Sequence, residues 1–417
     1  MSFSDIFCDT QDLISIDTAL TNLCEAAVSV EHSENIAVID CVGRVLAEDI
    51  KSSLDVPAYD NSAMDGFALK AADIEQGESL DLIGMALAGH PFEGTVQQGQ
   101  CVRIMTGAPV PNGADAVIMQ ERAQVESRVD GDKVSFSVTT KAGANIRRAG
   151  EDIASGTTIL AKGRKLTVAD SGLLASLGIG KVKVNRKVVA AIFATGDELK
   201  TAGEGLSHGQ IYESNRTTII AMLKRMDVEV IDLGIIKDDK EKLRAAFIEA
   251  NEKADVVISS GGVSVGEADY TKDILTEQGT VGFWKLAIKP GKPFACGKLS
   301  DSYFLGLPGN PVSAMVTFHQ LAVPFIRRLA GQADIKPIRF NALLSEDIRK
   351  RPGRVDFQRG VFSTVDGVPS VKSTGKQGSG ILSSLSKANC YIIIERERGD
   401  AKAGETVTVE LFDGVLG

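Results

Sequence analysis

Cysteine and histidine are sparse in this sequence, and their spacing excludes the usual metal sites that depend on sulfur or imidazole. Six cysteines are scattered along 417 residues without a C-x-x-C pair, and the four histidines are equally dispersed. A disulfide framework or a thiolate zinc site is therefore not expected, and the cysteines are predicted to be reduced and mostly buried. A catalytic metal would depend on carboxylates and substrate oxygens, which are ligands of a hard ion such as Mg²⁺.

Long apolar runs are missing as well. No uninterrupted apolar stretch reaches the roughly 18 residues of a membrane helix, and Met1–Asp5 lacks the basic start and apolar stretch of a secretory signal. These absences predict a cytoplasmic protein with no membrane association. The formal net charge of −9 would repel nucleic acid, so no nucleic-acid partner is expected. An anionic ligand would need a local basic site, and the sequence offers Arg147-Arg148 and the group Lys285, Lys289 and Lys292.

The sequence does have the composition of a globular protein, with 43% hydrophobic and 24% charged residues. Its length predicts three or four domains. A first helix is expected over Ile16–Cys24 with Ser15 as N-cap. From about residue 60 to 145, short alternating segments between Gly and Pro predict a small β-rich domain. Residues 157–180 read as a strand and a helix that could pack back against the first helix, which would make the β-rich domain an insertion.

From about Arg186 the pattern alternates between apolar strands and helices, which predicts a parallel sheet covered on both faces. The last helix of this passage, Val312–Leu329, is expected to be amphipathic. Beyond Gly331 the strands predicted over 340–348, 356–362, 390–395 and 406–411 indicate a small β-barrel or sandwich without a long helix.

Three motifs follow strands of the α/β passage, and ligands of open α/β sheets bind at the carboxyl ends of strands. They are Thr195–Glu198, Ser259–Tyr270 and Gly306–Pro311. Two of them are glycine-rich turns ahead of helices, where free N–H groups favour phosphate. One such turn could be purely structural, but three at one edge of a sheet favour a ligand site.

The common nucleotide-binding signatures are excluded. Gly261–Gly266 has the spacing of a P-loop, but Glu267 stands where lysine is required, and no convincing G-x-G-x-x-G follows the first strand. Gly262–Gly266 also fits the G-x-S-x-G elbow of a serine hydrolase with Ser264 as nucleophile. The one downstream histidine, His319, falls in an apolar helix, where a packing role is favoured. Serine hydrolase is kept as the alternative function.

Carboxylates and lysines provide the remaining candidates. Asp197, Glu198, Asp238 and Asp269 lie at strand ends or in adjoining loops, and could hold a hard metal beside a phosphate-binding turn. Helix capping is the competing explanation, and it suits Asp238 and Asp239 ahead of the Lys240 helix well. Lys285–Pro293 places three lysines around a Pro/Gly turn, which is either a solvated loop or an oxyanion cradle. Asp60–Phe67, taken alone, is a structural turn with two carboxylates.

Together these motifs resemble the molybdopterin molybdenumtransferase family, which is called MoeA in bacteria and forms the E domain of gephyrin in animals. The resemblance covers essentially the whole chain. It is carried by Asp55–Pro57, Asp60–Gly66, Arg103–Ala108, Asn145–Arg148, Gly150–Asp152, Thr195–Leu199, Ser260–Tyr270, Lys289–Pro293 and Leu307–Ser313.

The resemblance implies four domains and a homodimer with a shared active site. The expected domains are an elongated α/β domain (1–59 and 147–183), an inserted β-rich domain (60–146), a doubly wound α/β molybdopterin-binding domain (184–333) and a C-terminal β-barrel (334–417). The implied reaction takes adenylylated molybdopterin and molybdate and, with Mg²⁺ as cofactor, releases AMP and leaves molybdenum on the dithiolene. A transient contact with the molybdopterin adenylyltransferase is also implied.

The resemblance also assigns roles to residues of this chain. The implied Mg²⁺ ligands are Glu198, Asp238 and Asp269, and the implied catalytic residues are Asp65, Asp152, Asp238, Asp269, Lys285 and Lys289. The implied substrate-binding residues are Thr106, Arg147, Gly261, Gly262, Ser264, Lys292, Pro308, Gly309, Ser313, Arg354, Arg359 and Ser379. Asp65, Thr106, Arg147 and Asp152 would come from the second subunit.

One motif departs from the family pattern. The family usually has Asp-Thr-Asn-Arg before the second helix of the α/β domain, whereas this chain has Glu213–Arg216. Ser214 is expected to keep the helix cap, and a ligand contact by the longer Glu213 is not expected. Because animal relatives anchor receptors, a noncatalytic scaffold is a further alternative. The retained carboxylates and lysines favour an enzyme.

Overall fold

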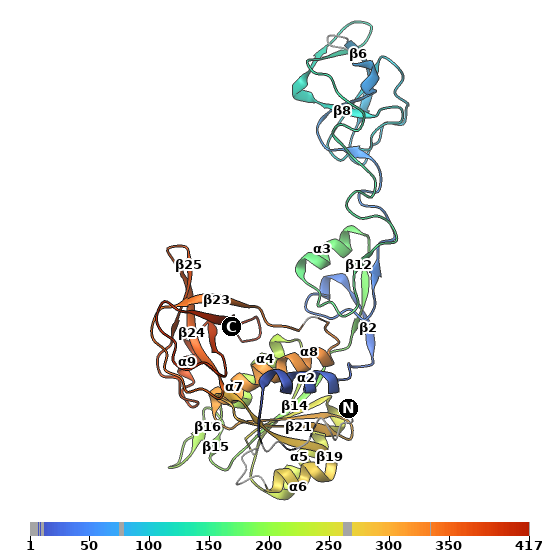
Figure 1. Ribbon diagram of the computed structural model, residues 1–417. Helices are drawn as coiled ribbons and strands as arrows, with labels where there is room; N and C mark the ends of the chain where they lie inside the picture. The colour runs from blue at the N-terminus through green and yellow to red at the C-terminus, as the bar shows by residue number, and fades with distance from the viewer. Residues whose placement is uncertain are drawn as a thin grey trace. The chain divides into compact units, whose positions relative to one another are not determined.

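The computed structural model describes residues 7, 9, 12–74, 79–261, 269–333 and 335–416, without the side chains of 269 and 270. Its contacts divide the chain into two compact units. The larger unit contains residues 1–47, 163–171 and 181–417, and the smaller contains 48–162 and 172–180. Both are drawn in Figure 1. The four domain boundaries expected from the sequence stay a prediction.

A seven-stranded sheet forms the centre of the larger unit, in the order β1-β19-β21-β22-β18-β14-β17. The strands are β1 Leu13–Ile14, β14 Val189–Thr195, β17 Glu229–Ile236, β18 Val256–Ser260, β19 Gly279–Leu286, β21 Pro293–Leu299 and β22 Tyr303–Leu307. Strands β17, β14, β18 and β22 are parallel neighbours, as the sequence predicts. The expectation of a wholly parallel sheet is wrong for β21, which runs antiparallel to β19 and β22. Its connections to both strands are short, and a parallel pairing would need a crossover of a dozen residues or more.

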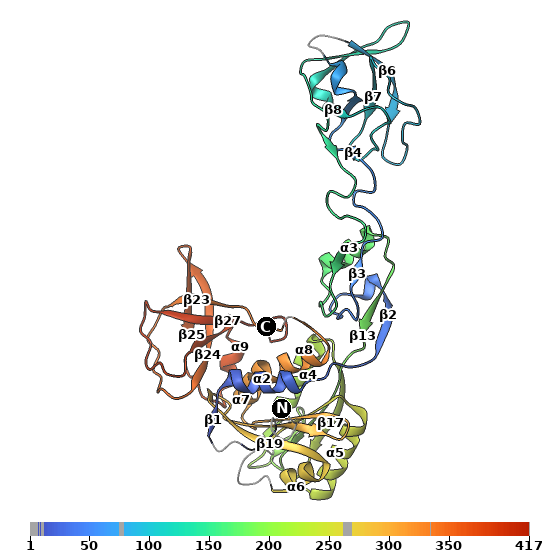
Figure 2. The same cartoon turned by 45° about the vertical axis from the view of Figure 1, so that its right-hand side comes forward.

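Helices cover both faces of this sheet, and alternate residues of each strand face opposite sides. In β14, Ile192 joins one core and Phe193 the other. The helices α5 Lys240–Lys253 and α6 Asp269–Gln278 lie on the Phe193 side, where Phe247 packs its ring 5.1 Å from that of Phe193. The other side carries α2 Ile16–Ala26, α4 Asn215–Arg225, α7 Pro311–Thr317 and α8 Val323–Leu329. Figure 2 shows the two layers of helices with the sheet between them. The doubly wound prediction is confirmed.

The chain from residue 311 to 329 differs from the expected amphipathic helix. A π-helical turn, Phe318–Ala322, separates α7 from α8, and residues 312–326 are all buried. The prediction of an exposed polar face is therefore wrong. The reason lies in the tertiary structure, because α2 packs against α8 and against the π-helical turn on the side away from the sheet.

The first helix begins where the sequence predicts and packs in the core of the larger unit. The Ser15 hydroxyl accepts a hydrogen bond from the Thr18 N–H at 3.0 Å, which caps α2. Its buried side chains, including Ala19 and Leu23, join the core that contains α8. The packing of α2 against the 157–180 return stays a prediction. The strand β2 Ser33–Ala37 pairs antiparallel with β13 Lys181–Asn185, which follows that return in the chain.

The C-terminal strands close a five-stranded barrel, which confirms the prediction. The strands are β23 Arg339–Leu344, β24 Val355–Val365, β25 Val368–Ser373, β26 Cys390–Ile394 and β27 Thr406–Leu411. Their order is β24-β25-β23-β27-β26, and a pairing of β24 with β26 closes the ring. A short strand, β20 Ile288–Lys289, adds to β24 in parallel. The strand β25 was not among the predicted strands, although Asp366-Gly367, both with positive φ, is a strong hairpin turn signal.

The smaller unit is β-rich, as expected. Its six-stranded sheet has the order β8-β5-β7-β6-β10-β9, with β5 Gly66–Leu69, β6 Ser79–Ala86, β7 Gln100–Ile104, β8 Ala116–Met119, β9 Ala123–Glu126 and β10 Lys133–Phe136. Short ribbons join β4 Asn61–Ser62 to β11 Ile146–Arg147 and β3 Ile50–Lys51 to β12 Thr158–Leu160. The helix α3 Val168–Ser176 follows the second ribbon in the chain, and the division between the two units falls within it.

The described cysteines agree with the expectation of reduced thiols. Cys24, Cys41, Cys101, Cys296 and Cys390 are free, and all but Cys24 are buried. Burial raises the pKa of the Cys101 thiol to about 12. Among the described residues, no helix combines the length and apolarity needed to cross a membrane.

Candidate functional site

A cavity of about 1060 Å³ lies at the carboxyl ends of the four parallel strands. These strands are neighbours in the sheet, so the loops after them meet at one edge. The cavity is lined by Thr195, Gly196, Asp197, Glu198, Leu199, Ile211, Tyr212, Glu213, Ser214, Asn215, Asp238, Leu243, Ser260, Gly261, Thr271, Pro293, Pro308, Gly309, Asn310, Pro311, Ser313, Gly380 and Leu382. It thus brings together six predicted site residues: Glu198, Asp238, Gly261, Pro308, Gly309 and Ser313.

Glu198 is held over the end of β14 by the conformation of Gly196. Gly196 has φ +147°, and a Cβ atom built on it would lie 2.5 Å from Glu198 Oε2. A glycine is therefore needed for the carboxylate to fold back over the backbone. The Glu198 carbonyl accepts a hydrogen bond from the Ile211 N–H at 2.9 Å, which fixes the turn. The carboxylate is exposed and faces a cavity large enough for a ligand.

Asp238 and Asp239 are adjacent but have different roles. Asp239 is the N-cap of α5, because its carboxylate accepts a hydrogen bond from the Lys242 N–H at 3.0 Å. Asp238 lines the cavity, and its N–H donates to Asp197 Oδ1 at 3.4 Å. The capping explanation therefore applies to Asp239, which leaves Asp238 as the candidate for ligand contact.

Gly261 holds the end of β18 close to the end of β14. Its φ is +91°, and an added Cβ would lie 2.8 Å from the Thr195 carbonyl oxygen. This close approach brings the Ser260–Gly261 turn to the same edge as Gly196. Gly262, Ser264 and the Asp269 side chain lie outside the described residues, so their roles stay predictions.

Asn215, which was not among the predicted site residues, connects three of the loops that line the cavity. Its buried side-chain amide donates to Ser260 Oγ at 2.9 Å and to the Gly309 carbonyl at 2.8 Å. Both amide hydrogens are used, so the start of α4, the end of β18 and the turn after β22 are held in register. The only signal in the sequence was its place in the Glu213–Arg216 motif.

The cap of α4 also differs from expectation. The Glu213 side chain is 2% exposed, and its Oε1 accepts from the Arg216 N–H at 2.5 Å. A weaker contact of 3.4 Å joins its Oε2 to the Thr217 N–H. Within the described chain the Ser214 side chain makes no capping hydrogen bond, so the expectation that it caps the helix is wrong. The longer side chain of Glu213 reaches the free N–H groups and takes this role.

The turn Lys285–Pro293, with its three lysines, lies beside the barrel, because β20 pairs with β24. The Lys289 Nζ is 3.1 Å from Asp356 Oδ2, and the Asp356 side chain is 2% exposed. A second hydrogen bond to Asp356 comes from Gln358 Nε2 at 3.2 Å. Lys292 is exposed and Lys285 is half-buried. None of these three lysines is among the described residues that line the 1060 Å³ cavity. Pro293, at the end of the same turn, does line it.

Of the predicted barrel residues, Ser379 is the one that meets a cavity loop. Its carbonyl accepts from the Val312 N–H at 3.0 Å, and the neighbouring Gly380 and Leu382 line the cavity. Arg354 is half-buried. Arg359 is completely buried and donates to Ser384 Oγ at 3.0 Å, and burial lowers the pKa of its guanidinium. In this position Arg359 supports the loop before Ser384 and is not exposed to an oxyanion in solution.

The smaller unit contains a second polar cavity, of about 590 Å³. It is lined by Met64, Asp65, Thr106, Met119, Gln120, Glu121 and Arg122. Asp65 Oδ1 accepts from both the backbone N–H and the hydroxyl of Thr106, each at 2.7 Å, and these hydrogen bonds lower the pKa of Asp65. The predicted pair Asp65 and Thr106 is thus one structural unit. Arg147 and Asp152 are exposed, and neither is among the described residues lining this cavity.

The carboxylates suit a metal that is held partly by substrate. The described residues contain no group of three His, Cys, Asp or Glu side chains that could hold a metal by itself. Mg²⁺ commonly uses one or two carboxylates together with substrate phosphates. Glu198 and Asp238, which face the same cavity, provide such a set.

His319 lies away from this cavity. Its Nε2 is 3.2 Å from Asp413 Oδ1, and its Nδ1 is 3.2 Å from the Gln320 amide nitrogen. A hydrolytic histidine would have to face Ser264, which follows the Gly261 turn in the chain. His319 has its ring nitrogens engaged in a buried network instead, as the packing interpretation predicted.

Comparisons with known proteins extend over nearly the whole chain. Residues 14–178 match the MoeA N-terminal region (domain I and II), 191–328 a probable molybdopterin binding domain, and 341–412 the MoeA C-terminal region (domain IV). The chain is 47% identical over 407 residues to a molybdopterin molybdenumtransferase of Haemophilus influenzae, covering 97% of this chain and 100% of the relative. A molybdopterin molybdenumtransferase of Nostoc sp. is 35% identical over 406 residues, covering 94% and 92%. The crystal structure of a molybdopterin biosynthesis MoeA protein from Pyrococcus horikoshii is similar with a TM-score of 0.82 and 30% identity, covering 96% of this chain and 100% of that one.

Proposed function

Because this chain belongs to the molybdopterin molybdenumtransferase family, we propose that it inserts molybdenum from molybdate into adenylylated molybdopterin and releases AMP. Membership in the family makes the chain a transferase of molybdenum cofactor biosynthesis. Neither a serine hydrolase nor a noncatalytic scaffold is supported. The proposal concerns the identity of the substrates, the metal and the residues that act.

The observation that carries this proposal is the cavity at the carboxyl ends of β17, β14, β18 and β22. The loops after β14 and β17 bring the exposed carboxylates of Glu198 and Asp238 to this cavity. The loops after β18 and β22 bring the glycine turns that contain Gly261 and Gly309. Backbone N–H groups of such turns suit phosphate oxygens. Glu198 and Asp238 would supply carboxylate oxygens, which a hard metal prefers. A phosphorylated substrate of the size of a pterin nucleotide fits a cavity of about 1060 Å³.

In this proposal Glu198, Asp238 and Asp269 hold Mg²⁺, which when bound withdraws charge from the phosphoanhydride. Gly261, Gly262, Ser264, Pro308, Gly309 and Ser313 bind and orient the substrate. Lys285, Lys289, Lys292, Arg354, Arg359 and Ser379 favour the oxyanions by charge or by supporting the loops around them. Asn215 acts as a positioning residue, because it holds three cavity loops in register.

The proposal also includes a cytoplasmic homodimer with a shared active site. Asp65, Thr106, Arg147 and Asp152 of the partner subunit would complete the cavity, which accords with the polar concavity around Asp65 and Thr106. The domain boundaries 1–59 with 147–183, 60–146, 184–333 and 334–417 belong to the same proposal. A transient contact with the molybdopterin adenylyltransferase would deliver the adenylylated substrate.

The direct test is to incubate the protein with adenylylated molybdopterin, Mg²⁺ and molybdate and to follow AMP. We expect AMP release that needs both molybdate and Mg²⁺, because the phosphoanhydride is broken as molybdenum is transferred. Omission of each component in turn is the control. If fresh substrate yields no molybdate-dependent AMP, the proposed reaction is wrong.

A further inference from the structure

A smaller cavity lies at the other end of the seven-stranded sheet, where β14 and β17 begin. Its volume is about 40 Å³, and it is lined by Gly43, Arg44, Val45, Lys165, Asn185, Arg186, Lys187, Val188, Met226, Asp227, Val228, Ile326, Arg327, Ala330 and Gln332. Five of these side chains are cations, and one, Asp227, is a carboxylate. Three further carboxylates, Glu34, Asp255 and Asp413, pair with cations of this cavity from outside its lining, so the five cations exceed the four carboxylates by one.

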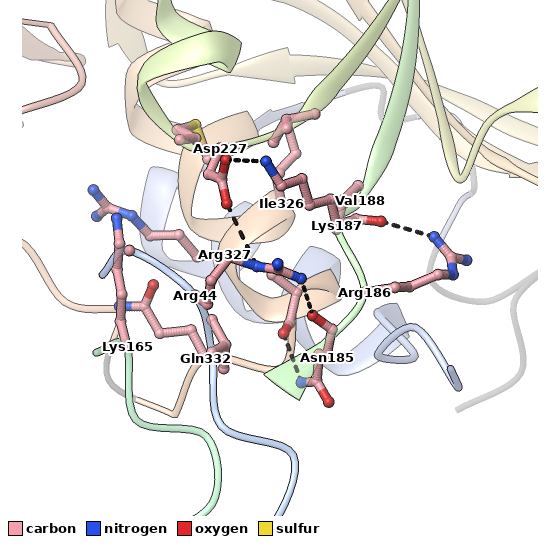
Figure 3. Close-up of a pocket in the computed structure, with 15 residues that line it drawn as sticks. Arg44, Lys165, Asn185, Arg186, Lys187, Val188, Asp227, Ile326, Arg327 and Gln332 are labelled. Carbon is pink, nitrogen blue, oxygen red and sulfur yellow. Dashed lines mark hydrogen bonds and ion pairs between the residues drawn. The ribbon is translucent and has the colours of Figure 1, made fainter. Parts of the chain in front are cut away.

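Most of these cations have a carboxylate partner, as Figure 3 shows for Asp227. Lys187 Nζ is 2.5 Å from Asp227 Oδ1, and Arg44 Nε is 3.5 Å from Asp227 Oδ2. Arg327 is paired with Asp413 at 2.6 Å, through one nitrogen of its guanidinium. An arginine has five N–H donors, so a single contact of this kind leaves most of them available for a ligand.

Lys165 is different, because its ammonium has no hydrogen-bond or ion-pair partner among the residues that the structure describes. The side chain is half-buried. Burial and the positive charge of Arg327 lower the pKa of Lys165, more than Asp413 and Asp227 raise it. In Figure 3 the ends of Lys165 and Arg327 reach the same side of the cavity. Two cations thus lie on the same side of the cavity, and Lys165 has no ion-pair partner among the described residues.

We propose that this cavity binds one small tetrahedral oxyanion, of the class of sulfate, phosphate and molybdate, between Lys165 and Arg327. A volume of about 40 Å³ accommodates an ion of this size and excludes a nucleotide. The anion would offset the repulsion between the two cations and accept hydrogen bonds that the protein leaves unused. The site is separate from the substrate cavity, since it lies at the amino ends of the strands.

Because the Lys165 ammonium makes no hydrogen bond within the described chain, Lys165→Met removes its charge without breaking a contact of the fold. The test measures thermal unfolding and calorimetric binding of the full chain with sulfate, phosphate or molybdate. Chloride at matched ionic strength is the reference. We expect at least one oxyanion to raise the unfolding temperature of the wild type saturably. Lys165→Met should bind it at least tenfold more weakly and unfold at a higher temperature than the wild type in chloride, and Lys165→Arg should retain binding.

Lys292→Met tests another cationic location for the anion, because Lys292 is exposed in the turn beside the barrel. It should keep the oxyanion response of the wild type. If chloride acts as well as the oxyanions, if no oxyanion binds, or if Lys165→Met responds like the wild type, the proposal is wrong. A response that Lys292→Met abolishes and Lys165→Met retains would assign the anion to the turn that contains Lys292 instead.

Discussion

The two ends of the seven-stranded sheet differ in how their charged side chains are placed. At the amino ends, the Arg186 guanidinium binds both carboxylate oxygens of Asp255, at 2.7 and 2.8 Å, and Asp255 also accepts the Val189 N–H at 2.8 Å. At the carboxyl ends, Glu198 and Asp238 are exposed around a large cavity. The charges of Arg186 and Asp255 are thus neutralised within the fold, whereas Glu198 and Asp238 face the cavity. Lys165 is the exception at the amino ends, and it marks the proposed oxyanion site.

The largest expected effect separates two adjacent carboxylates. Asp238→Ala should lower the rate of molybdate-dependent AMP release by about 100-fold, because a charge that offsets substrate and metal would be lost. Asp239→Ala should leave that rate nearly unchanged and lower the free energy of unfolding by about 1 kcal/mol, since it removes the cap of α5. Steady-state rates and urea unfolding of both variants check this. A greater loss of activity in Asp239→Ala would reverse our assignment.

Two buried asparagines, one at each end of the sheet, allow a direct comparison by mutation. Asn215 joins cavity loops, whereas Asn251 accepts from the Ser302 N–H and hydroxyl at the opposite end. Asn215→Asp and Asn251→Asp should each lower the free energy of unfolding by about 1–3 kcal/mol. Asn215→Asp should also lower kcat/KM by about 10-fold, mainly through KM, because the substrate-binding turns lose their register. Equal kinetic effects in both variants would mean that Asn215 has only a structural role.

The Arg186–Asp255 pair predicts how stability depends on pH. Burial would raise the pKa of Asp255, but hydrogen bonds from Arg186 and Val189 and the charge of Arg186 lower it below its ordinary value of 3.8. A pKa that is lower in the folded state stabilises the fold above pH 3.8, and this contribution disappears as the pH falls through the folded pKa. Asp255→Asn should therefore lower the free energy of unfolding by about 1–3 kcal/mol at pH 7 and less at pH 3. Urea unfolding at several pH values measures this, and an equal loss at both values would contradict it.

The smallest effect is expected at the departure from the family motif. Glu213→Gln keeps an acceptor for the Arg216 N–H but removes the charge at the start of α4. The free energy of unfolding should fall by about 1 kcal/mol, with AMP release changed less than threefold. Ser214→Ala is the matched control and should have no effect on the cap. If Ser214→Ala is the more destabilising variant, the cap has been assigned to the wrong residue.

Local sequence patterns sufficed for much of the fold, because apolar periodicity identifies strands and helices wherever one face is buried. They did not give the direction of β21 or the burial around 312–326, since both depend on which elements become neighbours. Strand ends also indicated that Glu198, Asp238, Gly261 and Gly309 would lie around one cavity, because parallel strands place those ends together.

Residues that act through contacts distant in sequence were missed for a related reason. Asn215 meets Gly309 across 94 positions, and Lys289 meets Asp356 across 67. The cations Arg44, Lys165 and Arg327 line one cavity, although they lie far apart in the sequence. Such pairs depend on tertiary structure, which periodicity and spacing do not encode.

Hydrogen–deuterium exchange with adenylylated molybdopterin and Mg²⁺ tests the contrast between the two ends of the sheet most directly. Bound substrate should slow exchange of backbone N–H groups in 196–199, 213–215, 260–261 and 308–313, which line the large cavity. Exchange in 185–189 and 226–229, at the amino ends, should stay unchanged. Protection confined to the amino-end segments, or none at the carboxyl ends under saturating substrate, would contradict this account.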